Sequence, residues 1–268
     1  MSTPGLFQLI ISHRHRFIFM HCRKVAGSTI AACLAPWLGP DDLHLGTWPE
    51  ALRQGVMPNR RAWADLRHPL AAASFGARLL RRPNRLFDRT HQVGALNGAQ
   101  RLKYRKALGP SPEHACARAV RDLYPQAWEQ YFKFCFVRNP FDRAFSDYRW
   151  RVSKVGNDDL TFGQFLEKMA AGDFRERAIP RQFDNWPIYT IDNSIAVDFV
   201  GRFERLETDL KKVFDRIGLP MPAALPHAKS MQRKHHYSRH YGDHERQLVD
   251  RLFKRELAEF DYRFDYHV

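Results

Sequence analysis

The stretch "RFIFMHCRKVAGSTIAACL", residues 16–34, decides the fold because it joins a strand pattern to a helix pattern through a short polar turn. Its first part is a continuous apolar run, which is typical of a central strand buried on both faces. The part that begins at Gly27 has the composition of a helix with small and hydroxyl residues in its first turn. Two adjacent cations, Arg23 and Lys24, lie between the strand and the helix, so the turn is strongly basic.

This turn is suited to binding an anion. A turn that leads into a helix presents backbone N–H groups and the positive end of the helix dipole. Gly27 allows close approach of the backbone, Lys24 adds a mobile charge, and Ser28 and Thr29 add hydroxyl donors. The sequence therefore predicts a phosphate or sulfate site, with a turn whose lysine only extends along the surface as the alternative. The order differs from a Walker A loop, in which the lysine follows the last glycine.

A second strand, turn and helix follow in "FKFCFVRNPFDRAFSDYRW", residues 132–150. Arg138 stands where this strand ends, and Ser146 lies about two helical turns further on. Arginine is the preferred bidentate partner of a phosphate, and a helical hydroxyl can complete the contact. We therefore expect a second anion site at Arg138 and Ser146. A structural ion pair between Arg138 and Asp142 is the alternative.

The remaining pattern alternates between strands and helices. The sequence predicts a helix stopped by Pro83 and a break in helical periodicity near Pro125. Asn139 and Pro140 are expected at the start of another helix. Further along, the pattern predicts a helix at 161–170, a strand at 196–201, a helix that ends at Gly218 and a last helix at 244–260. Such alternation indicates an α/β fold, a single domain over residues 1–268 with a central, mainly parallel sheet flanked by helices. Ligands bind such sheets at the carboxyl ends of the strands, where both polar turns fall.

Together these stretches resemble the sulfotransferases that use 3′-phosphoadenosine 5′-phosphosulfate (PAPS), in particular the carbohydrate group with the heparan 2-O and chondroitin 4-O enzymes. "FIFMHCRKVAGSTI" resembles that family's "FVHIPKTAGTS", and "FKFCFVRNPFDRAFSDY" resembles its "KFAFVRNPYDRLVSAY". "DFVGRFERLETDL" with "IGLP", and the last loop and helix, are similar to later parts of the family. The resemblance implies the P-loop-like sulfotransferase fold, PAPS as donor, 3′,5′-ADP as product and no metal.

The resemblance also implies which residues bind the donor. The 5′-phosphosulfate is expected on the first turn and the 3′-phosphate on the second. The expected donor-binding residues are Arg23, Lys24, Ala26, Gly27, Ser28, Thr29, Arg138, Ser146, Ser230 and Arg233. Two departures stand out: Arg23 replaces the family's proline, and "AIPRQ" at 178–182 lacks the histidine of the family's "HWxPQ".

Sulfuryl transfer to a hydroxyl needs a base and stabilisation of the leaving oxygen. His114 in "PEHACARAV" resembles the histidine of the family's "KHATAREI" and is the expected base, while Lys24 is expected to stabilise the bridging oxygen. Glu113 either orients the imidazole or faces solvent. The last loop contains three weaker candidates for the base, His227, His235 and His236. Its polar residues could cover the nucleotide: Lys229, Ser230, Arg233 and Lys234.

Composition limits the partners. The 268 residues include 43 Lys and Arg against 29 Asp and Glu, a formal net charge of +14, which favours polyanionic partners. The four sparse cysteines indicate reduced thiols, and neither a membrane-spanning run nor a signal pattern is present, so the sequence predicts a cytoplasmic protein without stable membrane insertion. The acceptor is expected to be a glycan or another hydroxyl compound, bound by a variable acceptor-side segment at about 41–110 and the Trp186 region.

Two other function classes remain as alternatives. A nucleotide-dependent phosphotransferase would need a Walker-type lysine and an acidic residue after a strand for magnesium, whereas Asp198 lies within the predicted strand. A nucleic-acid-binding protein would agree with the charge and with aromatics beside cations, but no zinc finger, helix-turn-helix or RNP signature is present, so no nucleic acid is expected. The sequence leaves the oligomeric state open.

Overall fold

The computed structural model describes residues 9–46, 48–226 and 235–265. These residues form two compact units, and each is described by itself. The sheet unit comprises the described residues up to 136 and those from 187 to 226, and the helical unit comprises 137–186 and 235–265. One domain over residues 1–268 stays a prediction.

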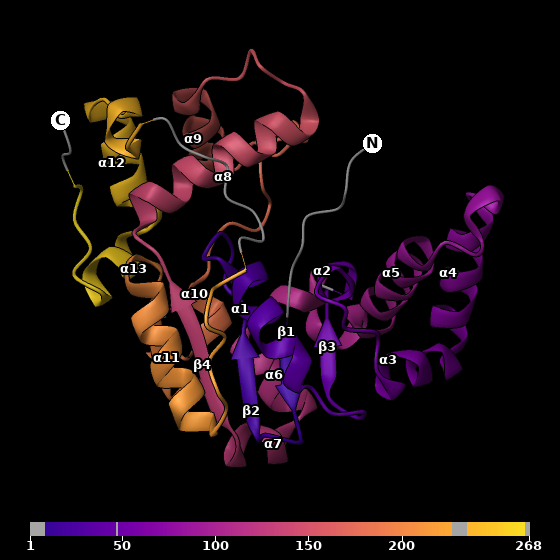
Figure 1. Cartoon of the computed structure of the whole chain (residues 1–268). Helices are drawn as coiled ribbons and strands as arrows, with labels where there is room; N and C mark the ends of the chain where they lie inside the picture. Colours follow the sequence, from indigo (N-terminus) through magenta and orange to yellow (C-terminus); the bar gives the residue numbers. More distant parts are fainter. Residues whose placement is uncertain (1–8, 47, 227–234, 266–268) are drawn as a thin grey trace. The chain divides into compact units, whose positions relative to one another are not determined.

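A five-stranded sheet with the order β3-β1-β2-β4-β7 is the centre of the sheet unit (Figure 1). Its strands are β1 (Leu9–Ser12), β2 (Phe17–Met20), β3 (Leu43–Leu45), β4 (Phe132–Val137) and β7 (Phe199–Arg202). β2 and β4 are parallel, whereas β1 is antiparallel to both β2 and β3. Helices flank this sheet, so the predicted α/β class with a central sheet is confirmed.

The two strands that lead into the predicted turns pair with each other. Phe19 faces Phe134 and Met20 faces Cys135 in the parallel register, and the rings of Phe19 and Phe134 stack with centroids 5.2 Å apart. Both strands are buried along almost their whole length, as their continuous apolar sequences predict. The parallel pairing brings the carboxyl ends of β2 and β4 to the same edge of the sheet.

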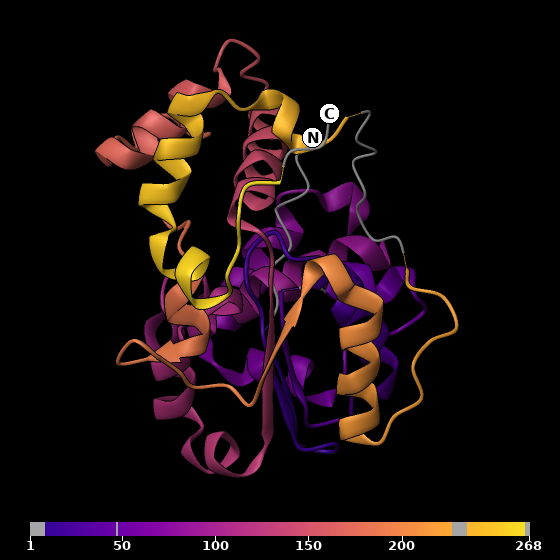
Figure 2. The same cartoon turned by 90° about the vertical axis from the view of Figure 1, so that its left-hand side faces the viewer.

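The helices of the sheet unit fill the long intervals between the strands. They are α1 (Gly27–Leu34), α2 (Trp48–Arg53), α3 (Arg60–Ala64), α4 (Pro69–Leu80), α5 (Arg89–Leu108), α6 (Ala117–Leu123), α7 (Pro125–Gln130), α10 (Trp186–Tyr189, which begins at the unit boundary) and α11 (Leu206–Ile217). Figure 2 shows α11 alongside β7, ending at the left-handed Gly218 as predicted. Pro83 and Pro125 separate helices as expected.

A second apolar cluster in this unit packs around Trp48, with Ala62, Val93 and Leu96. The indole nitrogen of Trp48 donates to Gln100 Oε1 at 2.9 Å. The predicted acceptor-side segment at 41–110 therefore contains a packed helical region. Its role toward an acceptor stays a prediction.

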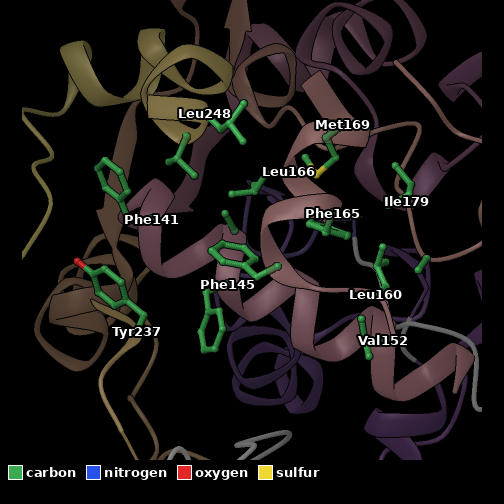
Figure 3. Packing of buried hydrophobic residues seen from close by; sticks show 14 of the residues in the cluster. Phe141, Phe145, Val152, Leu160, Phe165, Leu166, Met169, Ile179, Tyr237 and Leu248 are labelled. Atoms are coloured by element: carbon green, nitrogen blue, oxygen red, sulfur yellow. The ribbon is translucent and has the colours of Figure 1, made fainter. Parts of the chain in front are cut away.

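The helical unit contains α8 (Pro140–Val155), α9 (Phe162–Ala171), α12 (Asp243–Leu252) and α13 (Lys254–Glu259). Figure 3 shows their apolar faces meeting in one core, with Phe141, Phe145, Phe165 and Leu248 among its members. The Asn139 side chain accepts a hydrogen bond from Phe141 N at 3.1 Å, which confirms the predicted cap.

Several elements differ from the predictions. β1 and β3, of four and three residues, were not predicted. The strand predicted at 196–201 begins at Phe199, and Asp198 just before it accepts a hydrogen bond from Lys133 N at 2.7 Å. A short antiparallel pair, β5 (Thr190–Ile191) and β6 (Ser194–Ile195), precedes it. The last helix is broken at Phe253, whose φ is −122°.

Candidate active site

The first predicted turn connects β2 to α1 in the sheet unit. Lys24 and Ala26 have φ angles of 63° and 62°, in the left-handed region that non-glycine residues rarely adopt. Such turns direct consecutive N–H groups toward one side and form concavities that bind anions. Ala26 is the N-cap of α1 and has no side-chain oxygen to satisfy the N–H groups of the first helical turn. The turn therefore has the backbone geometry of an anion site.

Gly27 has a structural role in addition to the predicted one, which stays a prediction. A Cβ atom at this position would lie 1.8 Å from Nε2 of His21, so the His21 ring occupies the space where a side chain would start. The left-handed angles occur at Lys24 and Ala26, and Gly27 permits the close approach of the helix start to this ring. His21 was not predicted as a site residue, although its position directly after β2 could have indicated it.

His114 lies beside His21 in the same unit. It ends the short 3₁₀ helix Pro112–His114, and only 6% of the residue is exposed. Its ring stacks on that of His21 with centroids 4.7 Å apart and an angle of 28° between the planes. The sequence-predicted base and the residue that packs under Gly27 are therefore in direct contact.

One hydrogen bond fixes the tautomer of His114. The distance from its Nδ1 to the carbonyl oxygen of His21 is 2.7 Å, and since a carbonyl oxygen can only accept, Nδ1 carries the proton. Nε2 of the neutral ring therefore holds the lone pair. Burial, helped by the positive charge of Arg23, lowers the pKa of His114 well below 6.5, so the imidazole is neutral at pH 7.

Glu113 does not face solvent, so that prediction for it is wrong, and a role in orienting His114 stays a prediction. Its side chain is fully buried and forms an ion pair with Arg101 of α5 at 2.5 Å. Burial raises the pKa of Glu113, and the charge of Arg101 opposes that rise. The contact joins the turn that contains His114 to the long helix of the acceptor-side segment. Arg101 was not predicted, because nothing in a basic helix sequence marks one arginine as the partner of a buried carboxylate.

The second predicted turn is in the helical unit. Arg138 is buried, and its Nε donates to Asp142 Oδ2 at 2.7 Å, one helical turn further on. Its Nη1 lies 3.5 Å from Ser146 Oγ. The structure thus contains the pair with Asp142, which was the alternative to an anion site, and it places Ser146 beside the same guanidinium, while phosphate binding here stays a prediction. The two are compatible, because a guanidinium has five N–H donors.

The remaining predicted residues divide into two groups. Ser28 and Thr29 lie in the first turn of α1 and are partly buried. Ser230 and Arg233 lie outside the described residues, as do His227, Lys229 and Lys234. Of the other histidines considered as bases, His236 Nδ1 lies 2.9 Å from Ser238 Oγ and His235 Nδ1 lies 3.3 Å from Arg239 Nη1, both in the helical unit.

Two further sequence features have structural explanations. The stretch at 178–182, which lacks the family's histidine, places Ala178 and Ile179 in the core of the helical unit. Asp198 pairs with Lys133 at the amino-terminal end of β4, with Nζ and Oδ2 2.9 Å apart. A magnesium ligand of a phosphotransferase would be expected at the opposite, carboxyl-terminal end of the sheet.

Within residues 9–46, 48–226 and 235–265, every helix is too short or too polar to span a lipid bilayer. In the same part of the chain, no three His, Cys, Asp or Glu side chains are grouped as ligands of a metal ion. The four cysteines are free thiols, and burial raises the pKa of Cys33 to about 12.

Comparisons with known proteins agree with the resemblance. The model described as "Sulfotransferase family" matches residues 7–268. Carbohydrate sulfotransferase 14 of Homo sapiens is 30% identical over 144 residues, which cover 42% of this chain and 37% of that protein. The Danio rerio protein of the same name is 29% identical over 124 residues, covering 36% and 32%. An uncharacterized protein of Archaeoglobus fulgidus is 33% identical over 96 residues, covering 35% and 72%.

The matching part of the chain spans about a third of the length of these carbohydrate sulfotransferases. No solved structure matches the chain. Since the family model covers nearly all of the sequence, the chain belongs to the sulfotransferase family.

Proposed function

We propose that this protein transfers the sulfuryl group of PAPS to a hydroxyl group of a carbohydrate. Membership of the sulfotransferase family supports the reaction class, and the relatives named carbohydrate sulfotransferase 14 support the acceptor class. The observation that carries the proposal is the state of His114: a buried, neutral imidazole whose Nδ1–H donates to the His21 carbonyl and whose Nε2 holds the lone pair. A general base must be unprotonated and must hold a lone pair that can accept a proton.

The first turn is suited to binding the 5′-phosphosulfate of the donor. Its left-handed residues and the start of α1 provide N–H donors, the first helical turn contains no acidic residue, and Lys24 adds a positive charge. When bound, the donor supplies a sulfuryl group attached through a bridging oxygen to its leaving nucleotide. Lys24 stabilises the charge that develops on this oxygen, and Arg23 adds to the positive field.

His114 Nε2 accepts the proton of the acceptor hydroxyl while that oxygen attacks the sulfur. Its pKa, lowered mainly by burial, keeps the base unprotonated before reaction, and the His21 carbonyl retains the Nδ1 proton throughout. After proton transfer the His114 ring is a cation in a buried site. The hydrogen bond from its Nδ1–H to the His21 carbonyl is then charge-assisted, which stabilises this cation. The ion pair between Glu113 and Arg101 holds the 3₁₀ turn that positions this ring.

Arg138 and Ser146 are proposed to bind the 3′-phosphate of the donor. Asp142 orients the guanidinium through Nε and Nη2, and Nη1 lies 3.5 Å from Ser146 Oγ. A bidentate contact between arginine and phosphate together with a serine hydroxyl is a strong, directional anion site. Support for this assignment comes from the sequence of the turn and from the geometry of this helix start.

Transfer of label from PAPS tests the proposal. The protein is incubated with ³⁵S-labelled PAPS and a panel of glycans, small alcohols and phenols, and labelled product is separated from the donor. We expect sulfation of at least one glycan, loss of transfer in His114→Ala, and retention in His91→Ala, whose ring contacts the Leu79 carbonyl elsewhere in the same unit. Transfer to phenols alone would contradict the acceptor class, and an active His114→Ala variant would contradict the base.

A further inference from the structure

The helical hairpin of α4 and α5 ends in an unusual surface. The two helices lie side by side, and the ten residues that join them, "LRRPNRLFDR" at 80–89, form what we call the hairpin tip (Figure 1). Phe87 is 96% exposed, more than any other large apolar side chain that the structure describes, and Leu80 is 70% exposed. Transfer of such groups from water to an apolar phase is favourable, so the tip would gain free energy on contact with an apolar surface.

Positive charge surrounds these apolar groups. Four exposed arginines occupy the tip: Arg81, Arg82, Arg85 and Arg89. The only carboxylate among the ten residues, Asp88, accepts hydrogen bonds from Thr90 N at 2.8 Å and His91 N at 3.3 Å, and so caps α5. None of the ion pairs found among the described residues includes any of the four arginines. The tip therefore combines a net positive field with exposed apolar groups.

We propose that the hairpin tip is a docking surface for an anionic lipid bilayer, at the depth of the headgroups. A bilayer surface offers both components that the tip needs: anionic headgroups for the arginines and an apolar boundary for Phe87 and Leu80. An anionic glycan would satisfy the arginines, but it offers no partner for an exposed leucine. This proposal does not depend on the proposed sulfuryl transfer.

The other end of the same hairpin provides an internal comparison. Arg105 and Lys106 near the end of α5 are also exposed cations, roughly 24 Å along the helix from Arg89. There the neighbouring Tyr104 and Leu108 are buried and Leu102 is 37% exposed, so these cations lie beside much less exposed apolar surface than those of the tip. If charge alone decided binding, removing a cation at either end would weaken binding by a similar amount per charge, whereas the proposal assigns the binding to the tip.

Vesicle flotation with the full chain tests the proposal. The probes are pure phosphatidylcholine vesicles and phosphatidylcholine vesicles in which about a third of the lipid is phosphatidylserine. We expect binding to the anionic vesicles only. The triple variant Arg81→Gln, Arg82→Gln, Arg85→Gln should lower the partition coefficient on the order of 100-fold, and Phe87→Ser about tenfold. The control variants Arg105→Gln with Lys106→Gln, and Leu102→Ser, should change it less than about threefold.

A tryptophan at position 87 locates the contact directly. Emission from Phe87→Trp, measured against the wild-type background, should shift to shorter wavelength on anionic vesicles and be quenched by brominated lipid. Equal binding to both vesicle types, or equal losses in tip and control variants, would overturn the proposal. Two other outcomes would also overturn it. If the triple variant lost affinity for a sulfated glycan while no vesicle bound, the tip would bind a glycan. If Phe87→Ser changed the oligomeric mass in sedimentation, the tip would contact a second copy of the chain.

Discussion

His114 is the residue on which the proposed chemistry depends most. Replacing it with alanine removes the proton acceptor, so we expect turnover to fall by about 10²- to 10⁴-fold while binding of 3′,5′-ADP stays nearly unchanged. Steady-state rates and calorimetry measure the two quantities. His91→Ala, in the same unit, should change neither, and a comparable loss in that control would show that His114→Ala acts through the fold.

The pH dependence of the wild type follows from the same residue. The base is active when neutral, and its pKa lies well below 6.5, so kcat should stay level through neutral pH and fall only in the acid range. The effect on stability has the same direction. Below pH 6.5 the unfolded chain binds a proton that the folded site resists, so stability falls as pH falls toward the pKa of the folded state. Activity that halves near pH 6.5 would contradict this prediction.

Arg138 provides a test of donor binding. Arg138→Ala should weaken 3′,5′-ADP binding by about 1.5 to 3 kcal/mol, because a charged hydrogen bond to a phosphate is lost. Arg151→Ala is a matched control, since Arg151 pairs with Asp147 at 2.8 Å in the same helix, with the same spacing of four residues. Isothermal calorimetry with 3′,5′-ADP measures both variants. Equal affinities in the two would remove Arg138 from the donor site and leave it as a structural partner of Asp142.

The residues of the site differ in how far the sequence could predict them. Lys24, Gly27 and Arg138 follow apolar strands in short polar turns, and this local pattern is visible in the sequence. The contact of His114 with His21 joins positions 93 residues apart, so no local pattern contains it. The pairing of Glu113 with Arg101 was missed because it depends on how α5 packs against the 3₁₀ turn.

An ion pair between two helices stabilises the helical unit. Arg143 of α8 and Glu256 of α13 are each about 4% exposed and form a short ion pair, and Arg143 Nη1 also donates to the Phe183 carbonyl at 3.1 Å. Removing one charge leaves the other buried, so Glu256→Leu should cost about 3 to 5 kcal/mol of unfolding free energy. The double variant Arg143→Met, Glu256→Leu should recover most of that loss. Urea unfolding followed by circular dichroism measures these changes.

An exposed pair in the same unit is the control for this prediction. Arg263 and Asp261 are both more than 80% exposed, and screening by water makes such pairs weak. Arg263→Ala should therefore change stability by less than about 1 kcal/mol. If Glu256→Leu were as mild as this control, the buried pair would not stabilise the fold.

Helices were easier to predict than strands for physical reasons. The starts and ends of α8 and α11 follow from local chemistry, an asparagine cap followed by proline in one and a left-handed glycine in the other. β1 pairs with the adjacent β2, but β3 is held by β1 far along the chain, and Asp42 adds to this by accepting hydrogen bonds from Ser12 Oγ at 2.6 Å and His13 N at 2.7 Å. Such long-range contacts leave no periodic signal in a short segment.

The net charge of +14 acts on the whole molecule rather than on one contact. A positive field attracts an anionic donor, and salt screens it, with a Debye length that falls from roughly 10 Å at 0.1 M to 3 Å at 1 M. The KM for PAPS should therefore rise with ionic strength while kcat changes less. Steady-state kinetics in two different salts checks this, since screening predicts the same curve at equal ionic strength. A KM that is independent of salt would show that only short-range contacts bind the donor.

The fit of Gly27 against the His21 ring has a consequence for how the protein can evolve. A side chain at position 27 needs the volume that the imidazole fills, so Gly27 cannot be enlarged by itself without displacing His21 or the start of α1. Descendants of this sequence that acquire a larger residue at 27 should carry a smaller one at 21. The residues at these two positions are therefore expected to covary, although five other residues separate them in the chain.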